Sequence, residues 1–104
     1  MRESVIEKYL VDKVKALGGE VRKVKWISRN SAPDRLVMLP DNTFWAELKA
    51  PKEKPTAAQA REHERMRKMG QRVEVIDSIE RIEELLRNGK KDENTPSRRR
   101  KESS

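Results

Sequence analysis

Short segments with regular apolar spacing, separated by Gly, Pro and Asn, limit what this chain can fold into. Residues 3–17 have the spacing of an amphipathic helix, and Gly18-Gly19 predicts where that helix ends. The apolar stripe of this helix consists of Ile6, Leu10, Val14 and Leu17. Residues 20–27 alternate apolar and charged side chains, which is typical of a β-strand.

Two further strands are predicted at 34–39 and 43–49, and the turn residues Pro40-Asp41-Asn42 between them indicate a hairpin. A proline-marked basic loop follows. Thr56 is then expected to cap a helix that runs to Met69 and stops at Gly70.

A fourth strand is predicted at 72–76, and Ser78 is expected to cap a last helix that continues to about Asn88. The element order α-β-β-β-α-β-α predicts an α/β fold, with a mixed four-stranded sheet flanked by helices on both faces. This folded domain would comprise residues 1–88, and 89–104 would form a disordered basic tail.

The apolar content allows only a thin core. The chain has 104 residues, of which 41% are charged and 34% hydrophobic, and it contains four aromatic side chains. A chain of this length predicts one domain. Small domains with little apolar surface often associate, so a homodimer is expected.

The net charge of +7 favours a polyanionic partner. Residues 49–72 contain eight basic and three acidic side chains, so positive charge follows directly after the third strand. The tail cluster Arg98-Arg99-Arg100-Lys101 would strengthen nonspecific binding to nucleic acid, although a solubilising tail explains it equally well.

Several classes of site are excluded by composition. The chain has no cysteine and one histidine, so it has no disulfide, no thiolate metal site and no multi-histidine zinc site within one copy. It has no run of 18 apolar residues for a transmembrane helix, and its first residues are too charged for a secretory signal. A cytoplasmic protein without membrane contact is therefore expected.

Two carboxylates and a lysine form the most informative motif, Pro33-Asp34 … Glu47-Leu48-Lys49. Side chains two apart on a strand share a face, so Glu47 and Lys49 should lie side by side. Asp34 begins the neighbouring strand. Such a set can hold Mg²⁺ and activate water against a phosphodiester.

The alternative is a solvated strand face, with Asp34 as an ordinary turn residue. Three features favour the metal-site hypothesis: a strand predicted to be buried on both sides, a basic loop after Lys49, and a proline before Asp34 with hairpin-length spacing after it.

The motif resembles the PD-(D/E)xK nuclease signature. The longer set Ser31–Val37, Trp45–Pro51 and Gln59–His63 resembles the VRR-NUC family in its stand-alone viral or bacterial form. The resemblance implies a restriction-endonuclease-like fold in which Asp34, Glu47 and the Leu48 carbonyl bind Mg²⁺ or Mn²⁺. It also implies that Lys49 assists the attacking water and that Gln59 completes the site. A family glutamate on the first helix matches Glu7 best, and Glu3 is the alternative.

Other residues have weaker assignments. Lys52, Lys54, Arg61, Arg65 and Ser31 are candidates for contacts with the DNA backbone, or are ordinary surface residues. His63 shares a helix face with Gln59 and either contacts phosphate or packs beside the site. Trp26 and Trp45 either stack on unpaired bases or, as their scarcity favours, pack in the core or at a dimer interface.

Together these observations predict a metal-dependent, structure-selective DNA endonuclease. Stand-alone members of the VRR-NUC family resemble archaeal junction resolvases, which act as homodimers, so the resemblance implies a Holliday (four-way) junction or other branched DNA as substrate. The alternatives are a non-catalytic basic DNA-binding module and a monomeric nuclease acting on flaps or ends. The host could be a phage or a bacterium, and the minimal chain favours a phage.

Overall fold

The computed structural model describes residues 1–94 and confirms the predicted order of elements. The helices and strands are α1 (Glu3–Ala16), β1 (Glu20–Lys23), β2 (Arg35–Leu39), β3 (Asn42–Leu48), α2 (Ala57–Lys68), β4 (Val73–Ile76) and α3 (Ile79–Asn94).

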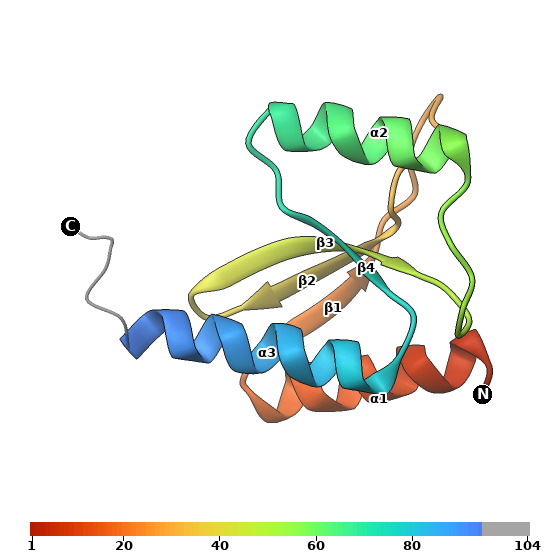
Figure 1. The fold of residues 1–104 in the computed structure, drawn as a ribbon. Helices are drawn as coiled ribbons and strands as arrows, with labels where there is room; N and C mark the ends of the chain where they lie inside the picture. Colours follow the sequence, from red (N-terminus) through yellow and green to blue (C-terminus); the bar gives the residue numbers. More distant parts are fainter. Residues whose placement is uncertain (95–104) are drawn as a thin grey trace.

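The strands form one sheet in the order β1-β2-β3-β4. β1, β2 and β3 pair antiparallel, whereas β4 pairs parallel to β3. A parallel neighbour needs a crossover, and α2 supplies it. α2 lies on one face of the sheet, and α1 and α3 lie on the other (Figure 1). The expected mixed sheet with helices on both faces is confirmed.

The apolar core lies between the sheet and the α1–α3 layer. Ile6, Leu10 and Val14 are fully buried, because their spacing of four residues puts them on one face of α1. They pack in one cluster with side chains from the sheet and α3, namely Val37, Phe44, Ala46, Leu48, Ile76, Ile82, Leu85 and Leu86. The predicted inner face of α1 is therefore correct for Ile6, Leu10 and Val14. It is wrong for Leu17, which is 42% exposed because α1 ends at Ala16 and the chain turns away at Gly18.

Both α1 and α2 end at a glycine with a positive φ of 86°. At the end of α1, the Gly18 N–H donates to the Lys15 carbonyl and the Gly19 N–H donates to the Val14 carbonyl. The corresponding pair of bonds closes α2 at Gly70 and Gln71. This is the Schellman arrangement, which satisfies the last carbonyl groups of a helix.

Some boundaries differ from the expectation. β1 ends at Lys23 instead of residue 27, because the chain then leaves the sheet to form the loop that leads to β2. α3 continues through Gly89 to Asn94, beyond the predicted end at Asn88. Glycine weakens a helix without necessarily ending it, and the Lys and Glu that follow favour helix. The rest of the predicted tail, including Arg98-Arg99-Arg100-Lys101, lies outside the described residues.

Across residues 1–94, none of the helices combines the length and apolar character that crossing a membrane would need.

Gly19 is expected to tolerate alanine less well than Gly70. A Cβ at Gly19 would lie 2.3 Å from the Met38 carbonyl oxygen and 2.9 Å from a Val14 methyl, so the packing of α1 on β2 must shift. We expect Gly19→Ala to lower the free energy of unfolding by about 3 kcal/mol or more.

Gly70→Ala is the matched control, because a Cβ there meets nothing within 4 Å and only the positive φ opposes it. We expect Gly70→Ala to lower the free energy of unfolding by about 1–2 kcal/mol. Equilibrium urea unfolding compares the two variants, and equal losses would contradict the close approach at Gly19.

Candidate active site

The antiparallel register of β2 and β3 brings the two predicted carboxylates together. Arg35 pairs with Ala46 in this register, so the next position places Asp34 opposite Glu47. The Asp34 carbonyl accepts a hydrogen bond from the Val24 N–H at 2.9 Å, so the backbone at Asp34 is still held by the chain leaving β1. Residues directly opposite each other on antiparallel strands have side chains on the same face.

Lys49 joins this pair on the face of the sheet that α2 covers. It lies two residues beyond Glu47, and its N–H donates to the Ile76 carbonyl at 2.9 Å, which continues the alternation of β3. The charges of both Lys49 and Asp34 act on Glu47. Asp34, Glu47 and Lys49 are therefore close enough to act as one group of charges.

Glu47 is only 9% exposed, and α2 supplies its hydrogen-bond partners. The Gln59 Nε2 atom donates to Glu47 Oε2 at 3.3 Å, and His63 Nε2 lies 3.2 Å from Glu47 Oε1. Gln59 and His63 are one helical turn apart, so both reach the same carboxylate. His63 is buried and packs beside the site, which is one of its two predicted roles.

Gln59 also helps to begin α2. Its backbone N–H donates to Thr56 Oγ1 at 3.1 Å, and its side-chain oxygen accepts from the Thr56 N–H at 2.9 Å. This capping box fixes the first turn of α2 and orients Gln59 toward Glu47. The Thr-x-x-Gln spacing was a usable signal in the sequence, but the prediction considered only the cap at Thr56.

Burial raises the pKa of Glu47 above its ordinary value. The hydrogen bond from His63, the charge of His63 and the charge of Lys49 oppose this shift, whereas the charge of Asp34 adds to it. His63 and Lys49 therefore offset only part of the free-energy cost of removing the charged carboxylate from water. A cation placed between Asp34 and Glu47 would supply the missing compensation.

The register also identifies a backbone oxygen. The position opposite Leu48 in the β2–β3 register belongs to Pro33, and proline has no N–H to donate across the ladder. The Leu48 carbonyl thus receives no ladder hydrogen bond from that position. Its side chain is buried in the core, which holds the backbone in place. The predicted donors Asp34, Glu47 and Leu48 are all oxygens, as Mg²⁺ and Mn²⁺ prefer.

Arg35 links Asp34 to Glu7, a contact that the sequence analysis did not predict. Its guanidinium lies 2.8 Å from Asp34 Oδ1 and 2.7 Å from Glu7 Oε2. Burial alone would lower the pKa of Arg35, but the hydrogen bond to Glu7 and the charges of both carboxylates raise it overall. Arg35 therefore connects Glu7 to Asp34 of the acidic pair.

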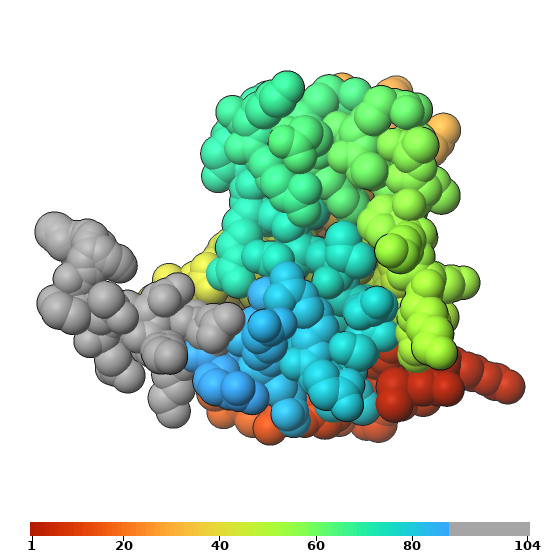
Figure 2. Space-filling model, viewed as in Figure 1, coloured from red at the N-terminus to blue at the C-terminus, as the bar shows by residue number. Residues whose placement is uncertain are grey.

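The side chains predicted to contact the DNA backbone lie in different surroundings. Lys52 and Lys54 are exposed in the loop between β3 and α2, and Arg61 is exposed on α2. These three form no ion pair with any side chain from residue 1 to 87, the part of the chain whose side chains the structure describes. The loop and α2 form a continuous surface along one side of the molecule (Figure 2).

Arg65 differs from these three because it is paired. Its guanidinium lies 2.6 Å from Glu62, whose buried carboxylate also receives Arg29 at 3.0 Å. Arg29 comes from the β1–β2 loop, so this cluster ties that loop to α2. Ser31 is half-buried in the same loop.

The two tryptophans pack against each other outside the apolar core. Their ring centroids are 5.1 Å apart and the planes are inclined by 44°. Both rings are half-buried and lie outside the main apolar cluster, so core packing is wrong for this pair, whereas packing at a dimer interface stays a prediction. The physical reason is that Trp45 points to the α2 face of the sheet, whereas the main core lies on the opposite face.

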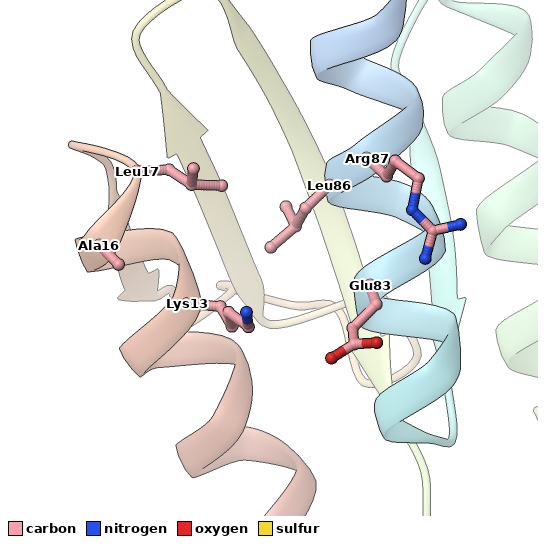
Figure 3. A pocket seen from close by; sticks show the side chains of 6 residues that line it. All are labelled: Lys13, Ala16, Leu17, Glu83, Leu86 and Arg87. Atoms are coloured by element: carbon pink, nitrogen blue, oxygen red, sulfur yellow. The ribbon is translucent and has the colours of Figure 1, made fainter.

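A separate cavity of about 380 Å³ lies between α1 and α3, away from Glu47. Leu17 and Leu86 point toward each other across it, with Lys13 and Glu83 nearby (Figure 3). Within the part of the chain that the structure describes, no three His, Asp or Glu side chains form a metal-binding group.

The sheet and the acidic pair with its lysine have the layout of a PD-(D/E)xK nuclease, and comparisons with known proteins give the family. A solved structure described as "VRR_NUC domain" superimposes with a TM-score of 0.75 and 40% sequence identity, covering 82% of this chain and 94% of that one. The chain belongs to the VRR-NUC family of nucleases.

A curated phage protein supports this assignment. The protein named "Putative nuclease p44", from Acyrthosiphon pisum secondary endosymbiont phage 1, is 47% identical over 79 residues. The match covers 75% of this chain and 85% of the phage protein. No protein-family model matches the sequence.

The raised pKa of Glu47 predicts a pH-dependent stability difference between wild type and Glu47→Gln. The folded state holds a proton on Glu47 more tightly than the unfolded chain does. The stability from this proton is fully present below the ordinary pKa and is lost as pH rises through the raised value. Glutamine cannot ionise, so the variant avoids this loss.

We therefore expect the melting temperature of Glu47→Gln, relative to wild type in EDTA, to increase from about pH 4 to about pH 8. Thermal unfolding followed by circular dichroism at several pH values measures the difference. A constant or shrinking difference would show that burial does not dominate the ionisation of Glu47.

Proposed function

We propose that this chain is a metal-dependent, structure-selective DNA endonuclease that hydrolyses phosphodiester bonds at the site formed by Asp34, Glu47 and Lys49. The observation that carries the proposal is the meeting of these three side chains on the α2 face of the sheet. There, the positive and hydrogen-bonding neighbours of Glu47 offset only part of the cost of burying its carboxylate. Membership of the VRR-NUC family supports nuclease chemistry at such a site.

The donor set fits Mg²⁺ or Mn²⁺. Asp34 and Glu47 would each offer a carboxylate oxygen, and Leu48 would offer its backbone carbonyl. When bound, the cation would act as a Lewis acid toward the phosphodiester and would lower the pKa of water. Hydrated Mg²⁺ needs few protein ligands, so two carboxylates and one carbonyl are sufficient.

The remaining residues prepare this site. Gln59 and His63 hold the Glu47 carboxylate from α2, so its oxygens are positioned before any ligand arrives. Lys49 would orient or deprotonate the attacking water and offset the charge that develops on the phosphate. Arg35 would hold Asp34, with Glu7 acting through Arg35. Lys52, Lys54, Arg61 and Ser31 would hold the DNA backbone, with Arg65 contributing less because Glu62 neutralises part of its charge.

A four-way junction cut by a homodimer is our proposed substrate and assembly. The thin core, which fills one face of the sheet, supports association with a second copy. A dimer would present two sites at a fixed distance, which suits the paired, symmetric nicks that resolve a junction. A monomer acting on flaps or ends is the alternative.

Lys49→Ala is expected to lower metal-dependent cleavage by at least about 100-fold, because it removes the proposed activator of water. Single-turnover assays with labelled junction, flap and linear duplex DNA in Mg²⁺ or Mn²⁺ measure the rate. Lys68→Ala is the matched control, because Lys68 lies at the far end of α2 from Gln59. DNA binding by wild type with no cutting in either metal would instead favour a non-catalytic DNA-binding module.

Metal binding can be tested without activity. We expect Mg²⁺ or Mn²⁺ to raise the melting temperature of wild type and to leave that of Asp34→Asn and Glu47→Gln nearly unchanged. An equal rise in all three proteins would place the cation elsewhere.

The assembly has its own test. Sedimentation velocity is expected to give a dimer, and junction cleavage is expected to give two nicks at symmetric positions. A monomer that cuts flaps faster than junctions would overturn this part of the proposal and leave the metal site intact.

A further inference from the structure

A groove beside Asp34 is lined by basic and aromatic side chains that have no role in the proposed metal site. The chain between β1 and β2 shapes this groove, which has a volume of about 640 Å³. Its lining includes Lys23, Lys25, Trp26, Arg29, Asn30 and Asp34. We propose that this groove binds an unpaired DNA strand that continues from the scissile phosphate. This inference rests on the proposed function of the acidic pair and specifies how that site selects its substrate.

The charges in the groove suit a phosphate backbone. Lys23 ends β1, which is an edge strand, and Lys25 follows two residues later. Neither lysine forms an ion pair with a side chain that the structure describes. Arg29 also lines the groove, and Glu62 holds one of its nitrogens at 3.0 Å while about half of the side chain stays exposed. The only carboxylate of the lining is Asp34, so a strand bound at Asp34 would pass directly over these three cations.

Trp26 offers a fixed aromatic ring in the same groove. Its Nε1 atom donates to the Pro33 carbonyl at 2.8 Å, and its ring packs against Trp45. The ring is therefore held in place before binding, which lowers the entropy cost of stacking a base on it. Bases in a duplex are stacked on one another and cannot reach such a ring, so the groove favours an unpaired strand.

The tip of the loop adds an apolar contact. Ile27 is 89% exposed, so its side chain contributes little to folding. Ser28, next to it, has a φ of 63°, a conformation that few residues other than glycine adopt. An exposed apolar side chain on a strained turn, between Lys25 and Arg29, is suited to contact a splayed base.

The alternative explanation for the lysines is protection of the edge strand against pairing with other sheets. That role predicts that oligonucleotides leave the tryptophan fluorescence unchanged.

The chain contains two tryptophans, Trp26 and Trp45, and they pack against each other at the groove. Intrinsic fluorescence therefore reports on the groove directly. The experiment is a titration of the full chain in EDTA with oligothymidylate of about eight nucleotides, and with a blunt hairpin duplex.

We expect the single strand to quench the fluorescence at lower concentration than the duplex does. Trp45→Phe should keep most of the quenching and Trp26→Phe should lose it. Lys23→Ala/Lys25→Ala should weaken binding about ten-fold and lower the slope of log affinity against log salt by about 1.4. Ile27→Ser should weaken binding a few-fold without lowering the melting temperature, because Ile27 is exposed.

Lys13→Ala/Lys15→Ala is the control with the same loss of charge. These lysines lie in the last turn of α1, at the opposite end of β1 from the groove. Equal weakening by both double variants, quenching by duplex alone, or no quenching of wild type would each overturn the inference. Because EDTA prevents metal-dependent cutting, strand binding can succeed where cleavage fails. Cleavage without quenching would refute the groove and leave the acidic site standing.

Discussion

The pairing of β2 with β3 is the constraint on which the rest of the structure depends. The two-residue turn Pro40-Asp41 lies midway between Asp34 and Glu47, so a hairpin closed there must bring these residues opposite each other. A slip of one residue would turn Glu47 toward the apolar core and Ala46 toward α2. The core resists such a slip, because Val37, Phe44 and Ala46 already fill the face against α1.

Burial of Glu47 shows how the fold supports a chemically demanding group. A carboxylate with so little exposure is unfavourable unless it is hydrogen-bonded or neutralised. α2 provides His63 and Gln59, and the same Gln59 side chain stabilises the start of α2. α2 covers Glu47, and the hydrogen bonds to Glu47 in turn hold α2 against the sheet. The uncompensated remainder of the desolvation favours a cation, which is consistent with the proposed chemistry.

Two arginine-centred contacts organise the surroundings of the site. Arg35 ties Asp34 to Glu7 of α1, and the Arg29–Glu62–Arg65 cluster ties the β1–β2 loop to α2. These contacts join segments that are distant in sequence. They hold the β1–β2 loop, the start of β2, α1 and α2 around the acidic pair. The proposed strand-binding groove lies where this loop meets Asp34.

The element order and the buried positions Ile6, Leu10 and Val14 of α1 could be predicted from sequence, because they depend on local spacing and on the glycine and proline signals. The stop at Gly18-Gly19 and the cap at Thr56 are examples. The end of α3 could not be predicted, because Gly89 weakens a helix without dictating a turn. The pairing of Arg29 with Glu62 and of Arg35 with Glu7 could not be predicted either, since these partners lie far away in sequence and a paired arginine has the same local pattern as an unpaired one.

The sequence by itself determined which side chains share a strand face and how far they lie from the turn, and these relations place Asp34, Glu47 and Lys49 together. Only the tertiary structure decided how buried Glu47 is, which helix supports it, and that Trp26 and Trp45 pack outside the core. The physical reason is that periodicity is a property of neighbouring residues, whereas desolvation and ion pairing depend on what the folded chain brings near from a distance.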